Sequence, residues 1–211
     1  MPERRRSGVL LAGGQNTRFG GEPKGLRPFG GARLADRPLR ALMDACDEAL
    51  VAANDPEARR WFPFQRIVCD ETPGLGALGA LRTALHHSRH DVVVVCAWDM
   101  PFVTPELLSA LAAMVEDGAP CCVPVHANGL SEPLCAAYRR SVCLPATVQL
   151  LVLFEDFAAH ALREQVGGAA WRIEDHLQAD DATRIFSNVN TADDLVHAAR
   201  WLTDHPTPDS P

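Results

Sequence analysis

A glycine-rich loop near the start of the chain carries residue types suited to binding a phosphate chain. The loop follows the apolar run 8–11 and reads Leu11-Ala12-Gly13-Gly14-Gln15-Asn16-Thr17-Arg18-Phe19-Gly20-Gly21-Glu22-Pro23-Lys24. Glycines let the backbone approach a ligand closely, and N–H groups turned into such a loop bind anions. Arg18 and Lys24 add fixed positive charge. We therefore expect the loop to hold the phosphates of a nucleoside triphosphate.

Two common phosphate-binding loops do not match this pattern. The P-loop has lysine directly after its last glycine, whereas Lys24 lies between Pro23 and Gly25. The dinucleotide-binding fingerprint separates its first two glycines by one residue, whereas Gly13 and Gly14 are adjacent. An ordinary glycine-rich turn is the remaining alternative. The ordered series of glycine, arginine, glycine and lysine after an apolar run disfavours it.

A carboxylate at an expected strand end is the second feature that suits chemistry. Asp99 follows the apolar run 92–97 as part of Trp98-Asp99-Met100-Pro101. Ligands of open α/β sheets bind outside the carboxyl ends of the strands. Mg²⁺ takes one or two carboxylates and completes its shell with water and phosphate. Asp99 is therefore a candidate metal ligand, and an aspartate that only caps a helix is the alternative.

Polar side chains also follow other expected strands. Asp70 begins a glycine-rich turn, and Asn54 ends the second strand. An amide suits a base edge because it offers a donor and an acceptor together. Asn188 and Asn190 alternate along an expected last strand at 185–190, which would place both on one face. Asn190 could equally cap the closing helix.

Strand and helix signals alternate along the chain, which predicts α/β architecture with a mainly parallel sheet. The expected strands are 8–11, 49–53, 67–69, 92–97, 121–125, 133–138 and 185–190. Helices are expected after a cap at Asp36, over 78–87, after the start signal Thr104-Pro105, within 147–165 and after Thr191. We expect one domain over 1–204 and a disordered tail over 205–211.

Composition excludes several classes of protein. The 211 residues are 47% hydrophobic and 22% charged, as in globular enzymes, and the formal charge of -7 disfavours a nucleic-acid surface. No apolar run approaches the length of a membrane span, and no signal peptide is expected. The seven cysteines are odd in number and form no C-x-x-C pair. They favour buried thiols in a reducing cytoplasm. The net charge and the lack of a membrane span predict neither nucleic-acid nor membrane partners.

The loop pattern L-A-G-G-x-x-T-R-F-G-G-x-P-K resembles the signature loop of nucleotidyltransferases with a glycosyltransferase-A-like fold. Within them it is most similar to the molybdenum cofactor guanylyltransferases. The D-x-P at Asp99 and the N-x-N-T that begins at Asn188 also match that family, in order from 9 to 195. The chain departs from the family at Pro23, often aspartate, and at Trp98, often a small residue. Residues 147–172 match weakly.

The resemblance implies a three-layer Rossmann-like fold, with a mainly parallel mixed sheet and helices on both faces. It implies transfer of GMP from GTP to the phosphate of molybdenum-bound molybdopterin, with Mg²⁺ as cofactor and pyrophosphate as product. Molybdoenzymes or cofactor-delivery proteins are candidate partners. The implied nucleotide-binding residues are Leu11, Ala12, Gly13, Gly14, Lys24, Asn54, Asp70 and Asp99. The implied catalytic residues are Lys24, Arg18 and Asp99, with Asp99 as metal ligand and with Asn188 and Asn190 near the second substrate.

Two alternatives share part of this pattern. The second glycine of L-A-G-G, Gly14, favours guanylyl transfer over relatives that use CTP and typically show L-A-A-G. A nucleotidyltransferase that joins CTP to a pterin or a sugar phosphate would still share every loop feature. A non-catalytic nucleotide-binding protein is the other class, and it predicts loss of Lys24 or Asp99. Both residues are present.

Overall fold

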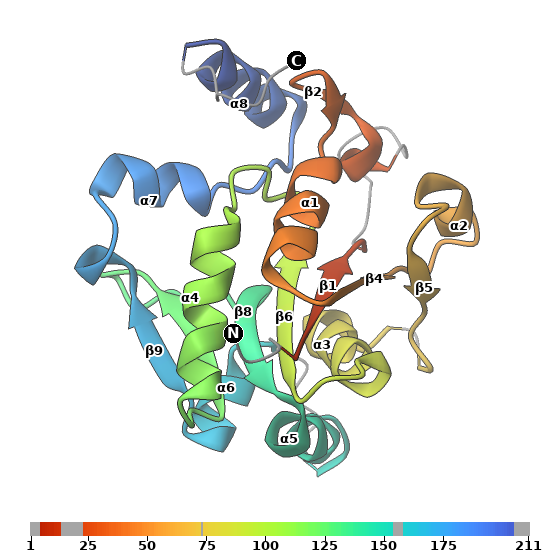
Figure 1. Cartoon of the computed structure of the whole chain (residues 1–211), viewed down its shortest axis with the longest axis vertical. Coiled ribbons are helices and arrows are strands. Elements are labelled where there is room, and N and C mark those ends of the chain that lie inside the picture. The colour runs from red at the N-terminus through yellow and green to blue at the C-terminus, as the bar shows by residue number, and fades with distance from the viewer. Residues whose placement is uncertain (1–4, 14–22, 73, 154–157, 205–211) are drawn as a thin grey trace.

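A seven-stranded sheet lies at the centre of the protein (Figure 1). The computed structural model describes residues 5–13, 23–72, 74–153 and 158–204. The strands are β1 Arg6–Leu11, β4 Glu48–Ala52, β5 Arg66–Val68, β6 Val92–Ala97, β7 Cys121–Val125, β8 Cys135–Arg139 and β9 Ala169–Arg172. Their order is β5-β4-β1-β6-β8-β7-β9, and β8 alone runs antiparallel to both of its neighbours. The predicted mainly parallel mixed sheet is confirmed.

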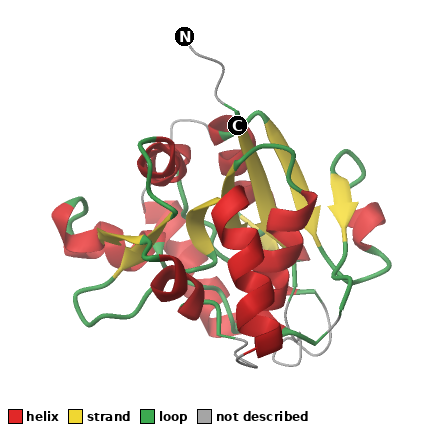
Figure 2. Ribbon diagram, turned by 90° about the horizontal axis from the view of Figure 1, so that it is seen from below, coloured by secondary structure: helices red, strands yellow, loops and turns green. Residues whose placement is uncertain are grey.

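Helices cover both faces of this sheet (Figure 2). They are α1 Asp36–Ala45, α2 Ala58–Trp61, α3 Gly76–His87, α4 Pro105–Glu116, α5 Arg140–Leu153, α6 Ala161–Val166, α7 Ala179–Ile185 and α8 Ala192–Asp204. Alternate side chains of β1 serve two cores: Leu10 packs with α1 and α4, and Val9 packs with α3 and α5. The three-layer arrangement therefore follows from strands that are apolar on both faces.

The local start signals for two helices had different outcomes. The Thr104 hydroxyl accepts the Leu107 N–H over 3.3 Å, so the predicted cap of α4 is confirmed. Asp36 does not cap α1: it is the first helical residue, and its carboxylate accepts the Arg33 N–H over 2.9 Å. Met43 of this helix is 53% exposed.

The expected last strand at 185–190 is wrong. Ile185 ends α7, and the described residues 186–190 form no strand. The backbone donors of this stretch are used elsewhere: the Val189 N–H reaches the Asp99 carbonyl over 2.9 Å, and the Asn190 N–H reaches Asp194. The alternation of polar and apolar residues there belongs to a loop. The last strand is β9, in the stretch that matches the family weakly.

The C-terminal helix closes one end of the sheet. Phe29 and Leu34, in and after the hairpin of β2 (Pro28–Phe29) and β3 (Ala32–Arg33), form a small core with Phe102, Val189 and Ala198. In Figure 1, α8 accordingly lies next to β2. The helix expected within 147–165 is α5, which begins earlier, at Arg140, followed by the short α6.

Two expectations stay open. The single domain over 1–204 stays a prediction, and the tail 205–211 lies outside the described residues. Within the part of the chain that the structure describes, no helix has both the length and the apolar character of a membrane span.

Candidate active site

The carboxyl ends of β1 and β6 meet where the sheet reverses its direction of growth. From β1 the chain moves outward to β4 and β5, and then returns to pair β6 on the other side of β1. Such a reversal creates a crevice outside the strand ends, where ligands bind. The Trp98 N–H donates to the Leu11 carbonyl over 3.2 Å, and the Ala12 N–H to the Ala52 carbonyl over 2.8 Å. These bonds fix the start of the phosphate loop beside Asp99.

The structure describes the two ends of the phosphate loop. Leu11 and Ala12 are buried, whereas Gly13 is exposed. A Cβ atom on Gly13 would meet no described atom within 4 Å. Gly14 and Arg18 lie outside the described residues. The loop ends at Lys24, which begins the 3₁₀ turn η2, Lys24–Leu26.

The Lys24 ammonium joins three segments that are far apart in the sequence. It donates to the Asp99 carboxylate at the end of β6, and to the Asn190 amide oxygen over 2.9 Å. The side chains of Lys24 and Asp99 are only 16% and 10% exposed. Lys24 is also the only lysine in the chain. The structure therefore brings together three of the predicted site residues.

A hydrogen-bonded cap holds Asn190 in place. Its backbone N–H and that of Thr191 both donate to the Asp194 carboxylate, over 2.9 and 2.8 Å, and the Asp194 N–H returns to the Thr191 hydroxyl over 3.1 Å. Burial acts to raise the pKa of Asp194, but these hydrogen bonds outweigh it and lower the pKa. Thr191, and not Asn190, therefore caps α8. Asn190 is free to turn its side chain to Lys24.

Asn54 and Asp70 form a second polar group, at the ends of β4 and β5. Their side chains and backbone exchange two bonds: Asn54 Nδ2–H donates to the Asp70 carboxylate over 2.7 Å, and the Asp70 N–H to Asn54 Oδ1 over 2.8 Å. Thr83 donates to the other Asp70 oxygen over 2.6 Å. The sheet order places this pair across β1 from Asp99. The predicted residues thus lie on both sides of the loop strand.

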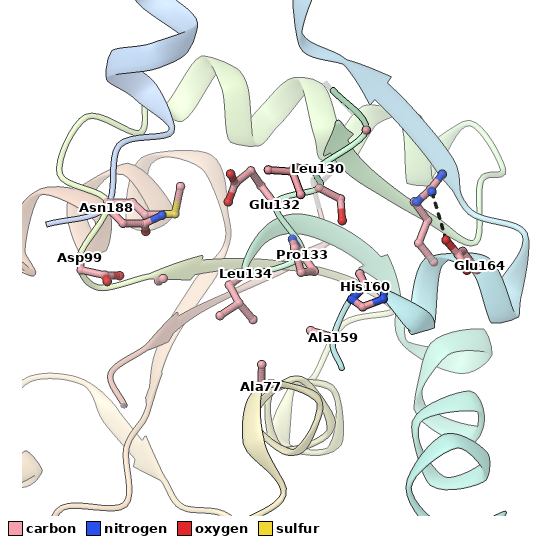
Figure 3. Close-up of a pocket in the computed structure, with 15 residues that line it drawn as sticks. Ala77, Asp99, Leu130, Glu132, Pro133, Leu134, Ala159, His160, Glu164 and Asn188 are labelled. Atoms are coloured by element: carbon pink, nitrogen blue, oxygen red, sulfur yellow. Dashed lines mark ion pairs between the residues drawn. The ribbon is translucent and has the colours of Figure 1, made fainter. Parts of the chain in front are cut away.

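A cavity of about 590 Å³ opens beside Asp99 (Figure 3). One end is lined by Asp99 and Asn188. Loop residues 129–134, which include Glu132, line its middle. His160, just before α6, and Arg163, within α6, line the other end. The Arg163 guanidinium lies 3.9 Å from the Glu164 carboxylate there. The lining therefore combines the carboxylates of Asp99 and Glu132 with the guanidinium of Arg163.

Some basic residues near this cavity line it and others do not, and the sequence alone does not distinguish them. Arg139 donates to the Val115 carbonyl and Arg140 to the Leu85 carbonyl, and neither lines the cavity. Arg163 and His160 do line it. They lie in the stretch 147–172, where the family motifs give no guide, and a charged cluster between apolar runs is the only signal they offer.

Comparisons with known proteins agree with this geometry. Residues 8–167 match the family described as "MobA-like NTP transferase domain". A probable molybdenum cofactor guanylyltransferase of Chloroflexus aggregans is 36% identical over 204 residues, which cover 93% of this chain and 94% of that protein. A second, of Thermococcus kodakarensis, is 33% identical and covers 97% of each chain. The chain belongs to the MobA-like nucleotidyltransferase family. It is therefore a nucleotidyltransferase, and the family predicted from the loop motif is confirmed.

Solved structures show the fold that this family shares with other nucleotidyltransferases. Molybdopterin-guanine dinucleotide biosynthesis protein A of Archaeoglobus fulgidus superposes with a TM-score of 0.78 at 24% identity, over 94% of this chain and 99% of that one. CMP:2-keto-3-deoxy-manno-octonic acid synthetase, solved with CTP, superposes with a TM-score of 0.70 at 14% identity, over 95% and 99%. The predicted nucleotidyltransferase fold is thereby confirmed.

Nucleotidyltransferases of this kind generally use a divalent metal, and Asp99 fits one. No group of three or more His, Cys, Asp or Glu side chains gathers among the described residues, so they form no cage made of protein alone. A magnesium ion needs no such cage, because it keeps several waters and takes one or two carboxylates plus substrate phosphates. Asp99 offers one carboxylate at the cavity wall. The donor set therefore suits a metal that arrives with a triphosphate.

Proposed function

We propose that this MobA-like nucleotidyltransferase transfers GMP from GTP to the phosphate of molybdenum-bound molybdopterin. One observation supports it above the others: the phosphate loop and the end of β6 converge so that Lys24 and Asp99 are in direct contact beside a cavity. The names of the two bacterial and archaeal relatives point to the same reaction.

The reaction needs positioning and charge neutralisation but no covalent intermediate. A phosphate oxygen of molybdopterin attacks the α-phosphorus of GTP, the bond from that phosphorus to the bridging oxygen breaks, and pyrophosphate leaves. Lys24 and the loop amides hold the triphosphate, and Arg18 helps to neutralise it. Asp99 would hold Mg²⁺, and the charge of that ion would neutralise phosphate oxygens and help pyrophosphate to leave.

The contact between Lys24 and Asp99 suits an exchange of partners. Each side chain neutralises the other while it is largely buried, so neither charge is left unpaired. A triphosphate with its metal ion supplies an anion for Lys24 and a cation for Asp99. Asn190 keeps the Lys24 ammonium in place during this exchange, because its amide oxygen also accepts from the ammonium.

The guanine base belongs on the other side of β1. A Cβ atom on Gly13 would meet no described atom within 4 Å, and Gly14, at the second position of L-A-G-G, has no side chain. Asn54 and Asp70 lie at the neighbouring strand ends. Their mutual bonds leave Asn54 with its second amide N–H for a base edge. GTP would then span β1, with its base beside Asn54 and its phosphates between Lys24 and Asp99.

Molybdopterin is the second substrate that we assign to the cavity, with its phosphate at the Asp99 end. Asn188 lines that end and is placed to contact it. Molybdoenzymes and cofactor-delivery proteins stay predictions as partners, as does location in the cytoplasm.

Incubation with each of the four nucleoside triphosphates, Mg²⁺ and molybdopterin tests the proposal, with pyrophosphate as the readout. We expect release with GTP, and calorimetry should show tighter binding of GTP than of CTP. Release with CTP alone would contradict guanine selection and favour the cytidylyl alternative. Binding of a nucleotide without release from any of the four would favour a non-catalytic nucleotide-binding protein.

A further inference from the structure

Two contacts run side by side between the 3₁₀ turn η2 and the end of β6. Lys24 touches Asp99, and the next residue along, Gly25, touches the preceding residue, Trp98. The first contact joins the charges to which the proposed function assigns the triphosphate and the metal. The second is a packing contact whose purpose neither the reaction nor the family match explains.

Trp98 fills the space directly against the Gly25 backbone. A Cβ atom on Gly25 would lie 2.5 Å from Cδ2 and 2.9 Å from Cζ3 of the indole ring, and closer still to Cε3. Ordinary contacts of such an atom begin at 3.4 Å. The φ angle of Gly25 lies outside the left-handed range, so its backbone conformation is open to other residues. The ring, and not the turn, therefore restricts this position to glycine.

Neither partner has room to move aside. The Trp98 side chain is buried with 2% exposure, and its ring stacks on Trp61 with centroids 6.4 Å apart and planes 28° apart. On the other side, the Gly25 carbonyl accepts the Ala35 N–H over 2.9 Å, which ties η2 to the start of α1. The turn η2 therefore packs against the indole on one side and is hydrogen-bonded to the start of α1 on the other.

Shape, and not a hydrogen bond, is what the indole contributes. Trp98 Nε1 is buried and has no hydrogen-bond partner among the described residues. A buried donor without a partner is destabilising, so a residue that served the core alone would gain by losing it. The flat ring compensates by filling the space beneath η2.

We propose that Trp98 and Gly25 are a positioning pair that sets how far Lys24 reaches toward Asp99 and the triphosphate. This inference rests on the proposed role of Lys24. The indole packs against η2. A side chain at position 25 would therefore displace the turn, and the Lys24 ammonium would move with it. A displacement of roughly 1 Å at a reacting site can lower the rate by about 10²-fold.

Paired substitutions test this inference. Gly25→Ala should lower kcat by about 10²-fold while the KM for the second substrate stays nearly unchanged, because the added methyl group shifts Lys24 and not the cavity. Gly25→Ala combined with Trp98→Leu should recover most of that loss, since the smaller side chain makes room for the methyl group. Trp98→Phe should retain most of the activity, because it keeps an aromatic ring and removes only an N–H that has no partner in the described part of the chain.

A matched control separates this coupling from general effects on stability. Trp171 is also a buried tryptophan, but it lies on β9 and stacks on His176. Gly25→Ala combined with Trp171→Leu should show no recovery, because substitutions without shared contacts have additive effects.

A second readout does not depend on activity. Lys24 is the only lysine, so an amine-acetylating reagent modifies one side chain, and peptide mass spectrometry separates it from the N-terminal amine. Gly25→Ala should speed acetylation of Lys24 several-fold, and Trp98→Leu should reverse this in the double variant. A double variant that stays inactive or unfolded, or single Gly25→Ala with unchanged kcat and acetylation, would overturn the inference. Failure of the wild-type protein to use GTP would instead count against the proposed function, and the acetylation result would still decide the positioning role.

Discussion

The Lys24 ammonium donates to the Asn190 amide oxygen across 2.9 Å, although the two residues are 166 positions apart in the chain. This bond ties the phosphate loop to the segment before α8. The same ammonium contacts Asp99, so one cation holds the loop, a strand end and the C-terminal segment together. The site is therefore assembled only when α8 has docked, and its chemistry depends on that docking.

Lys24→Ala should lower kcat by about 10²-fold, the usual scale for the loss of one strong contact to charge in the transition state. The protein should stay folded, since Asp99, the partner left without the ammonium, lines the cavity. Pyrophosphate release measures the effect, with circular dichroism as the folding control. Lys24→Arg should keep part of the activity because it keeps the charge. Near-normal turnover of the alanine variant would remove the loop from the mechanism.

Asn190→Ala should lower kcat by about ten- to a hundredfold, because a hydrogen bond to a charged group contributes about 1.5–3 kcal/mol. Its effect should be absent in a Lys24→Ala background, since the amide acts through the ammonium. Asn188→Ala is the matched control: it should raise the KM for the second substrate and leave acetylation of Lys24 unchanged. Equal effects of Asn190→Ala with and without Lys24 would contradict this assignment.

The Asp194 cap predicts a pH-dependent contribution to stability. Its pKa is lowered from the ordinary value of 3.8, because hydrogen bonds from Asn190 and Thr191 outweigh the effect of burial. The stabilisation is thus fully present above that value and is lost as the pH falls through the lower pKa of the folded state. Asp194→Ala should lower the free energy of unfolding by about 1 kcal/mol near pH 7. Denaturant unfolding at several pH values measures this, and a difference that persists in strong acid would contradict it.

Thiol reactivity should single out one cysteine. All seven cysteines are free, and Cys69 alone among them is exposed. Burial raises the pKa of Cys46 to about 12, so its thiol stays protonated and unreactive near neutral pH. Brief treatment with iodoacetamide should label Cys69 in the native protein, and every cysteine in denaturant. Mass spectrometry counts the labels, and rapid native labelling of Cys121 or Cys122 would mean that the β7 core is more open than the structure shows.

Much of the fold could be predicted because its signals are local. The run Val92–Ala97 is apolar on both faces and forms strand β6, as predicted. Thr104 and Pro105 begin α4, as predicted. The expected last strand was wrong because period-two alternation also occurs in loops, and tertiary bonds at Val189 settle the conformation there. Local sequence carries no record of such bonds.

The site likewise has residues that the sequence predicts and contacts that only the fold supplies. The sequence singled out Lys24, Asp99 and Asn190 as separate motifs, and the structure supplies their contact. Trp98 could be seen only as a departure from the family, because its packing against Gly25 depends on how η2 folds back onto β6. Arg163 was missed for a similar reason, since only the fold brings α6 to the cavity.

In the proposed reaction, the Asp99 carboxylate holds the metal ion that GMP transfer requires. Asp99→Asn keeps the size of the side chain and much of its hydrogen bonding but removes the charge that Mg²⁺ needs. The measurement is pyrophosphate release from GTP and molybdopterin as Mg²⁺ is raised, with circular dichroism to confirm folding. We predict a folded variant without activity at any Mg²⁺ concentration. A variant with the metal dependence of the wild-type protein would show that the ion is held elsewhere and would contradict the account.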